Sequence, residues 1–422
     1  MTAAEAAGAL TGPPIEQFET GFQRTAVHQV GEGCVLVRRP GTDRPTPLAP
    51  PRPEAAAALR ALRTPDVRLV LPEAVGDALH YRVPGTGVAA KLSVPGDCAT
   101  PPAHAAAALR GTGAALRQLH TEVPVTLART GPPGPARLAA WLRSDRAPGS
   151  SRAASAPAAG GPRAANTLAP GSPHATSTLA PGSPHATSTL APGSPHATST
   201  LAPGSPHATS TLAPGSPHAT STPAPGGPRA PITPTPASPP PANTPAPAGP
   251  RAAAALHSVA LRLLGSARWD RVLGWCEELA VGRPGDVFLH GAPSLGSIVV
   301  GPEPPHGWLM IGEELARGPA DHDLGWLLGE FVEWRMTLDR PVLAPAAPLD
   351  PEVYETTRAA LLRGYGPPAD PVAAGRSAVL RVFTHAHDFA AYMGWHPELL
   401  EYLAAIAELI DDEGARALSV PL

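Results

Sequence analysis

Hydrophobic and polar positions near the start of the chain alternate in a way that predicts a small β-rich unit. Two runs rich in β-branched residues flank Gly31-Glu32-Gly33, which has the composition of a hairpin turn. Further along, a proline and an acidic residue precede an alanine-rich run, as at the start of many helices. The predicted elements are a hairpin over 21–40, a helix over 53–62, and strands over 67–71 and 79–83.

The last third of the chain has helical periodicity. Leu399, Leu403, Ile406 and Ile410 are spaced so that they share one face of a helix. We expect this stripe to lie in the hydrophobic core. A second helix is predicted over 103–120, directly after the β-rich region.

The middle of the chain lacks both kinds of periodicity. Residues 147–251 contain no acidic residue and almost no large apolar side chain, and prolines are frequent. Within this segment, residues 167–222 repeat the 11-residue sequence Ser-Thr-Leu-Ala-Pro-Gly-Ser-Pro-His-Ala-Thr. A segment of this composition cannot bury enough apolar surface to offset the entropy lost on ordering. We therefore predict a disordered insertion, which is also a candidate docking segment for a partner.

Composition and charge exclude several classes of protein. The formal net charge of −3 gives no basic patch for nucleic acid. Three widely spaced cysteines match neither a disulfide framework nor a zinc motif. No signal peptide and no run of 18 apolar residues is present in the sequence, so we expect a cytoplasmic protein that does not interact with membranes.

One segment, residues 288–300, carries a recognisable motif. It contains His290-Gly291 and then Ser297 before an apolar strand-like run. This arrangement resembles the catalytic loop of the aminoglycoside phosphotransferase and choline-kinase family, where His-Gly-Asp and four further residues precede an Asn. Downstream, Ile311-Gly312 and Asp323-Leu324 align with that family's Ile-Asp and Asp-Leu pairs. The resemblance implies a kinase-like fold, with ATP and Mg²⁺ as cofactors.

Three functional positions of that family differ in this chain. Ala292 stands at the position of the catalytic Asp, Ser297 at that of the metal-binding Asn, and Gly312 at that of the metal-binding Asp. Phosphoryl transfer requires a carboxylate to orient the attacking hydroxyl and oxygen ligands to hold Mg²⁺. Alanine and glycine provide no ligand, and a serine hydroxyl is a weak one. No residue of a catalytic set is therefore intact in the loop.

Other residues near these positions are candidates for site or structural roles. The resemblance places Arg38 or Arg39 where the family has a basic residue that faces the nucleotide phosphates. Glu313 and Glu314 are weak metal candidates, because a one-residue slip along a strand turns the side chain to the other face. Asp323 is expected to have a structural role as an N-cap, because an Asp at the start of a helix accepts backbone N–H groups.

The sequence also contains His385-Ala-His387-Asp388, which superficially resembles a metal motif. Residues two apart do not share a helix face, so we interpret this trio as ordinary helix surface.

These features predict an α+β, bilobal kinase-like fold with a small β-rich N-lobe, a helical C-lobe and a long disordered insertion. The predicted boundaries are an N-terminal tail at 1–18, the N-lobe at 19–88, the start of the C-lobe at 89–146, the insertion at 147–251 and the rest of the C-lobe at 252–422.

Three hypotheses for function follow. The leading one is a catalytically degenerate pseudokinase of the phosphotransferase family that acts as a binding or regulatory module for an unidentified small molecule or protein. The first alternative is an active ATP-dependent phosphotransferase of small-molecule hydroxyls with a displaced metal site. The second alternative is a scaffold that works through its Pro-rich insertion.

Overall fold

The computed structural model describes residues 13–19, 22–41, 44, 47–85, 87–90, 101–128, 130–144, 250–339 and 350–419, together with six short strands between 165 and 221. These residues fall into two compact units, one formed by the two ends of the chain and the other by residues 148–242.

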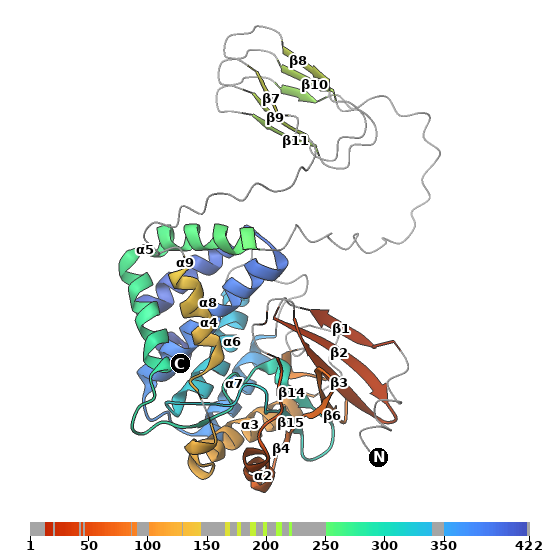
Figure 1. Ribbon diagram of the computed structural model, residues 1–422, viewed down its shortest axis with the longest axis vertical. Helices are drawn as coiled ribbons and strands as arrows, with labels where there is room; N and C mark the ends of the chain where they lie inside the picture. The colour runs from red at the N-terminus through yellow and green to blue at the C-terminus, as the bar shows by residue number, and fades with distance from the viewer. Residues whose placement is uncertain are drawn as a thin grey trace. The chain divides into compact units, whose positions relative to one another are not determined.

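A five-stranded antiparallel sheet forms the small lobe of the first unit (Figure 1). The strand order is β1-β2-β3-β6-β5, with bounds Glu16–Glu19, Gln23–Val30, Gly33–Pro40, Ala78–Val83 and Glu73–Val75 respectively. The β2–β3 pair confirms the predicted hairpin, and its register joins Val30 to Gly33 across the turn. Strand β3 is buried from Cys34 to Val37, so both faces of the sheet are covered at this strand.

A helix and a second small sheet connect this lobe to the rest of the unit. Helix α2 (Pro53–Ala61) begins with the predicted proline and buries Leu59. Strand β4 (Val67–Val70) pairs in parallel with β15 (Gly307–Met310), which pairs in turn with β14 (Ile298–Val300). The ladder between β4 and β15 continues to Ile311, whose N–H donates to the Val70 carbonyl at 3.0 Å. Residues early in the chain are thereby held beside the segment that follows Met310.

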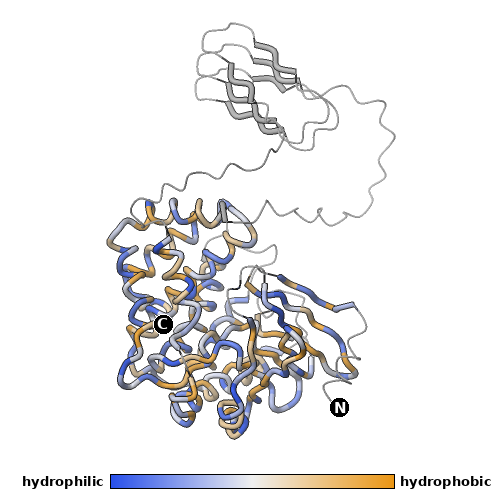
Figure 2. The backbone as a smooth tube through the Cα atoms, viewed as in Figure 1, coloured by the Kyte–Doolittle hydropathy of each residue, from blue (hydrophilic) through white to orange (hydrophobic). Residues whose placement is uncertain are grey.

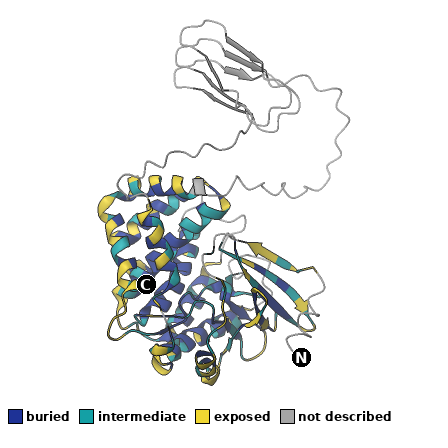
Figure 3. Cartoon of the chain, in the orientation of Figure 1, coloured by how far each residue is buried: buried dark blue, intermediate teal, exposed yellow. Residues whose placement is uncertain are grey.

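The large lobe is helical. Its helices are α3 (Pro102–Glu122), α4 (Pro133–Arg143), α5 (Pro250–Ala280), α6 (Asp321–Asp339), α7 (Pro351–Tyr365), α8 (Pro371–Met393), α9 (Glu398–Asp411) and α10 (Ala415–Leu418). Hydrophobic residues and buried positions concentrate between these helices (Figures 2 and 3). The predicted stripe on α9 is buried, which confirms its place in the core. None of the described helices is both long and apolar enough to cross a membrane.

The arrangement of a β-rich lobe followed by a helical lobe confirms the predicted bilobal α+β fold. The predicted helix over 103–120 corresponds to α3, and the strands predicted over 67–71 and 79–83 correspond to β4 and β6. The exact boundaries that we predicted between the regions remain predictions.

The second unit contains six parallel-paired strands formed mainly by the Ala-Thr-Ser part of the repeat. They are β7 (Ala165–Leu168), β8 (Ala175–Thr178), β9 (Ala186–Leu190), β10 (Ala197–Thr200), β11 (Ala208–Leu212) and β12 (Ala219–Ser221). One sheet has the order β12-β10-β8 and another the order β11-β9-β7, so each strand pairs with a strand two repeats away. These strands were not predicted for the insertion, although threonine, which recurs in every repeat, favours strand pairing. Residues 250 and 251 of the predicted insertion belong to α5, and its remaining residues lie outside the described part of the chain.

Candidate active site

The loop with the family motif runs from His290 to Ser297 and connects two short strands. Strand β13 (Val287–Leu289) leads into it, and β14 leads out. The backbone N–H groups of His290 and Gly291 donate to the two carboxylate oxygens of Asp323, at 2.7 and 3.0 Å. Asp323 is fully buried in the first turn of α6, so this clamp fixes the start of the loop against the helical lobe.

Asp323 also receives a contact from a distant histidine. The Nε2 atom of His120 lies 3.0 Å from the Asp323 carboxylate, and its Nδ1 atom lies 3.1 Å from the Tyr365 hydroxyl. Burial alone would raise the pKa of Asp323, but the hydrogen bond and charge of His120 outweigh it and hold that pKa below its usual range. The predicted structural role of Asp323 therefore takes a different form: α6 begins two residues earlier, and the carboxylate ties down the loop instead of capping its own helix.

The turn at His290-Gly291 has steric requirements. Gly291 has φ +94°, and a Cβ atom there would collide with the carbonyl oxygen of Glu314. The His290 ring is buried with Nε2 2.9 Å from the Met310 carbonyl oxygen, and burial lowers its pKa. A neutral, hydrogen-bonded ring is a structural support for the turn.

Ala292 and Ser297, the two loop residues that differ from the family motif, are engaged in packing and in local hydrogen bonds, respectively. Ala292 is half-buried and packs against the core of the helical lobe. The buried Ser297 hydroxyl accepts from the Ser294 N–H at 3.0 Å and donates to the Ser294 carbonyl at 2.6 Å. The first of these bonds and a reciprocal bond from the Ser297 N–H to the Ser294 side chain form a capping box on the short helix η3 (Leu295–Ser297), so the hydroxyl is engaged within the loop.

Gly312, at the position of the family's metal-binding Asp, has no room for a side chain. Its φ is +131°, a conformation that L-residues rarely adopt. A Cβ atom there would lie 2.9 Å from the Cδ of Pro51 and 3.0 Å from the Cδ of Pro72. Proline rings cannot rotate away, and the two prolines belong to the connections before α2 and after β4.

The next residue, Glu313, forms a buried ion pair with Arg38 of β3. Burial opposes the charge on Arg38, but Glu313 outweighs this effect and holds the pKa of Arg38 above its usual value. The Arg38 guanidinium also lies 5.2 Å from the ring centre of Tyr81. Burial and then the Glu313 charge raise the pKa of Tyr81. Arg39, by contrast, has a half-exposed side chain 3.7 Å from Asp77, because neighbouring strand residues point to opposite faces.

Glu314 is paired as well. Its carboxylate lies 3.6 Å from the guanidinium of Arg44, and both side chains are largely buried. Arg44 also stacks on the ring of Phe22, at 4.4 Å from the ring centre, and Arg137 of α4 lies 3.8 Å from the same centre. The β1–β2 connection is thus attached to the helical lobe through Phe22. No local pattern in the sequence links Arg44, Phe22 and Arg137, so their contacts were not predicted.

A buried charge network supports the far end of the loop. The Leu295 N–H donates to Glu330 at 2.7 Å, and Glu330 is 2.8 Å from Arg381. Arg381 is 3.4 Å from Glu333, which is 2.9 Å from Nδ1 of His385. The sequence interpretation of the 385–388 trio as ordinary surface is therefore wrong, because all three side chains contact other helices. His385 lies against Glu333 of α6, whereas His387 packs on Trp141 and Asp388 lies 3.5 Å from Arg137, both of α4.

Within the described residues, no three histidine, cysteine, aspartate or glutamate side chains come together as a metal-binding set. Among the sequence-predicted residues, Arg38 and Glu313 come together directly, and His290 and Gly291 come together with Asp323. Ala292, Ser297 and Gly312 provide no open oxygen ligand. A Mg²⁺ ion therefore does not fit the residues at the family's metal positions.

Comparisons with known proteins give low similarity. No protein-family profile matches the chain, and no curated protein matches its sequence. Similar solved structures include an AMP complex of spectinomycin phosphotransferase APH(9)-Ia, with 10% identity, a TM-score of 0.40 and all of both chains covered. Another is a choline/ethanolamine kinase family protein from Mesorhizobium loti, with 15% identity, a TM-score of 0.33, and 99% of this chain and 94% of that chain covered. A third is macrolide 2'-phosphotransferase type I, with 11% identity, a TM-score of 0.34, and 100% and 99% coverage.

Proposed function

We propose that this chain is a catalytically silent relative of the aminoglycoside phosphotransferases and choline kinases that acts as a binding or regulatory module. The observation that carries the proposal is the packing at Gly312. Pro51 and Pro72 occupy the space that the side chain of a metal-binding Asp would need, and the backbone has φ +131°. The loss of the carboxylate is therefore built into the packing around the site.

The charges around the site support the same proposal. Mg²⁺ requires near-octahedral oxygen ligands that are free to turn towards it. Glu313 and Glu314 are the nearest carboxylates in the sequence, and each is turned towards an arginine. For Glu313 to bind a cation, the buried Arg38 would have to lose its only ion-pair partner among the described residues. Removing one partner from a buried pair typically costs about 3–5 kcal/mol.

The loop keeps a fixed backbone conformation but lacks the carboxylate and the metal ligands that phosphoryl transfer requires. Asp323 holds the backbone at His290 and Gly291, and the side chains of Ser294 and Ser297 together cap the η3 turn. A loop held in this way is suited to keep a surface in a fixed shape for a ligand or a partner. The pairing of Glu313 with Arg38 is evidence against the displaced metal site, and no contact of the described residues favours the scaffold hypothesis.

Phosphoryl transfer provides the test of this proposal. The protein is incubated with labelled ATP, Mg²⁺ and a panel of aminoglycosides, choline and other small hydroxyl compounds. We expect no transfer above a protein-free blank. Transfer that is abolished by Glu313→Gln, but not by the exposed control Glu303→Gln, would refute the proposal and support a displaced metal site.

A further inference from the structure

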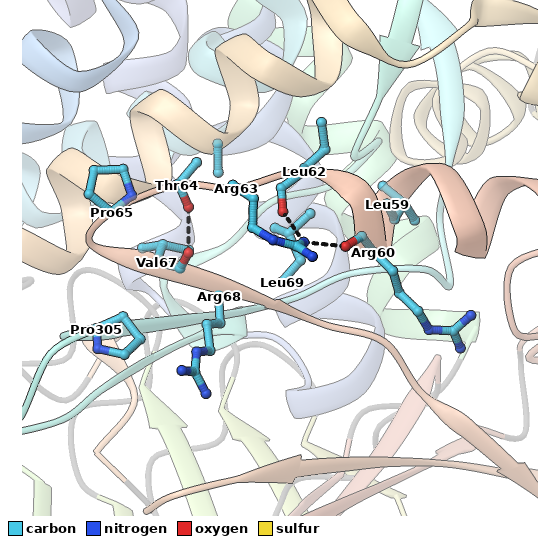
Figure 4. Close-up of a pocket in the computed structure, with 11 residues that line it drawn as sticks. Leu59, Arg60, Leu62, Arg63, Thr64, Pro65, Val67, Arg68, Leu69 and Pro305 are labelled. Atoms are coloured by element: carbon cyan, nitrogen blue, oxygen red, sulfur yellow. Dashed lines mark hydrogen bonds between the residues drawn. The ribbon is translucent and has the colours of Figure 1, made fainter.

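A pocket outside the candidate site lies where α2 ends and β4 begins (Figure 4). Its volume is about 540 Å³. Helix α2 and the following turn form one wall, β4 forms another, and Ala115 of α3 and Pro305 complete the lining.

Arginines are the only charged residues that line this pocket. Arg60, Arg63 and Arg68 are all exposed, and no acidic residue or histidine belongs to the lining. Arg63 folds back and donates to the Arg60 and Leu62 carbonyls at the end of α2 (Figure 4). In the described part of the chain, neither Arg60 nor Arg68 has a carboxylate within ion-pairing distance. Their charges are therefore available to a ligand.

The nearest acidic residue in the sequence does not neutralise these arginines. Asp66 lies between the two walls of the pocket in sequence, but it accepts two hydrogen bonds from Arg110 of α3, at 2.8 and 3.0 Å. The pocket thus keeps an excess of positive charge.

The remaining lining is mainly apolar. Leu59 and Val67 are buried beneath the pocket, and Leu62 and Leu69 are half-buried at its sides. Such a surface favours an apolar group, because burial of apolar area releases about 25 cal/mol per Å². A fully hydrated ion such as inorganic phosphate would leave this part of the pocket unused.

We propose that this pocket binds a small amphipathic anion, namely a phosphate or carboxylate group attached to a hydrocarbon body. Guanidinium groups bind both anions through paired, charge-assisted hydrogen bonds. The volume is within the range of about 300–1,000 Å³ that small-molecule sites occupy. Arg60 and Arg68 point to different sides (Figure 4), so each offers the anionic group a guanidinium at one side of the pocket, and the hydrocarbon body lies over the leucines.

The proposal is independent of whether the candidate active site is silent. None of the pocket residues belongs to the loop 290–297 or to the segment 312–314. A finding of phosphotransferase activity would therefore leave this inference unchanged, and absence of ligand binding here would leave the proposed function unchanged.

The experiment is calorimetric titration of the full chain with four probes below their micelle-forming concentrations: octyl phosphate, octanoate, inorganic phosphate and octanol. The test variant is Arg60→Gln with Arg68→Gln. The control is Arg262→Gln with Arg363→Gln, which removes the same charge from exposed arginines elsewhere. Circular dichroism verifies that both variants fold.

We expect one of the two amphipathic anions to bind with one-to-one stoichiometry. The anion that binds more tightly identifies the preferred head group. Affinity should fall by about 10-fold or more in the test variant, as expected for lost bonds between charged groups, and should be unchanged in the control. Inorganic phosphate and octanol should each bind at least about 10-fold more weakly than the preferred anion. Equal binding by the test variant and wild type, binding of inorganic phosphate as tight as octyl phosphate, or no binding of either amphipathic anion would overturn the proposal.

Discussion

The substitution Gly312→Ala tests the packing that underlies the proposed loss of the metal site. The alanine Cβ would approach the rings of Pro51 and Pro72 at 2.9 and 3.0 Å, closer than ordinary van der Waals contact. It would also have to adopt φ +131°.

Two terms contribute to the expected loss of stability. Placing an L-residue in a glycine-only backbone conformation costs about 1–3 kcal/mol. Forcing extra atoms into a packed site costs a further ~1–3 kcal/mol. We therefore expect Gly312→Ala to lower the free energy of unfolding by about 2–6 kcal/mol.

The control is Gly285→Ala, because Gly285 also has a positive φ, +91°, but has no atom within 4 Å of a Cβ. It should carry only the backbone term of about 1–3 kcal/mol. Urea denaturation followed by circular dichroism measures both variants. If Gly312→Ala destabilises the protein no more than Gly285→Ala does, the prolines do not exclude a side chain and the steric argument fails.

Three further predictions follow from the charges and from the organisation of the chain. Arg38→Gln should destabilise the protein by about 3 kcal/mol, because it leaves Glu313 buried and unpaired. Replacing both residues, Arg38 by Met and Glu313 by Leu, should recover most of this loss, and a double-mutant cycle without coupling between the two positions would contradict the prediction. The Glu333 charge raises the pKa of His385, and burial opposes this effect only in part. The pair of His385 with Glu333 therefore contributes fully to stability below about pH 6.5, and this contribution is lost as the pH rises through the raised pKa. His385→Gln should therefore flatten the stability curve above pH 6.5, and an unchanged curve would refute the assignment. Deleting residues 150–242 and joining the ends with a short Gly/Ser linker should shift Tm by less than about 4 °C, because these residues belong to a separate unit; a larger fall would show that the lobes depend on them.

Local patterns in the sequence were sufficient to predict many of the elements. The hairpin over 21–40 has turn residues between its strands, and helix α2 begins with Pro53 and Glu54, so short-range physics determines both elements. The short strands β13, β14, β15 and β16 (Ala316–Gly318) were harder to predict, because three or four residues are too few to show a period.

The candidate site was predictable only in part. The motif pointed to the loop and to the positions that differ from the family's catalytic Asp and its two metal ligands, but it gave no indication that Pro51 and Pro72 close the space at Gly312. The choice between Arg38 and Arg39 depended on which face of β3 meets the loop. The partner, Glu313, is 275 positions away from Arg38, and no local pattern records such a contact.

The central claim is that the site holds no Mg²⁺ for a nucleotide, and calorimetric titration with ATP tests it most directly. The titration is run on the full chain with excess Mg²⁺ and again with EDTA. Because Gly312 has no ligand and Glu313 is paired with Arg38, Mg²⁺ should not strengthen ATP binding, whether that binding is measurable or absent. An affinity for ATP that rises about 10-fold or more with Mg²⁺, and loses that gain in Glu313→Gln, would contradict the account.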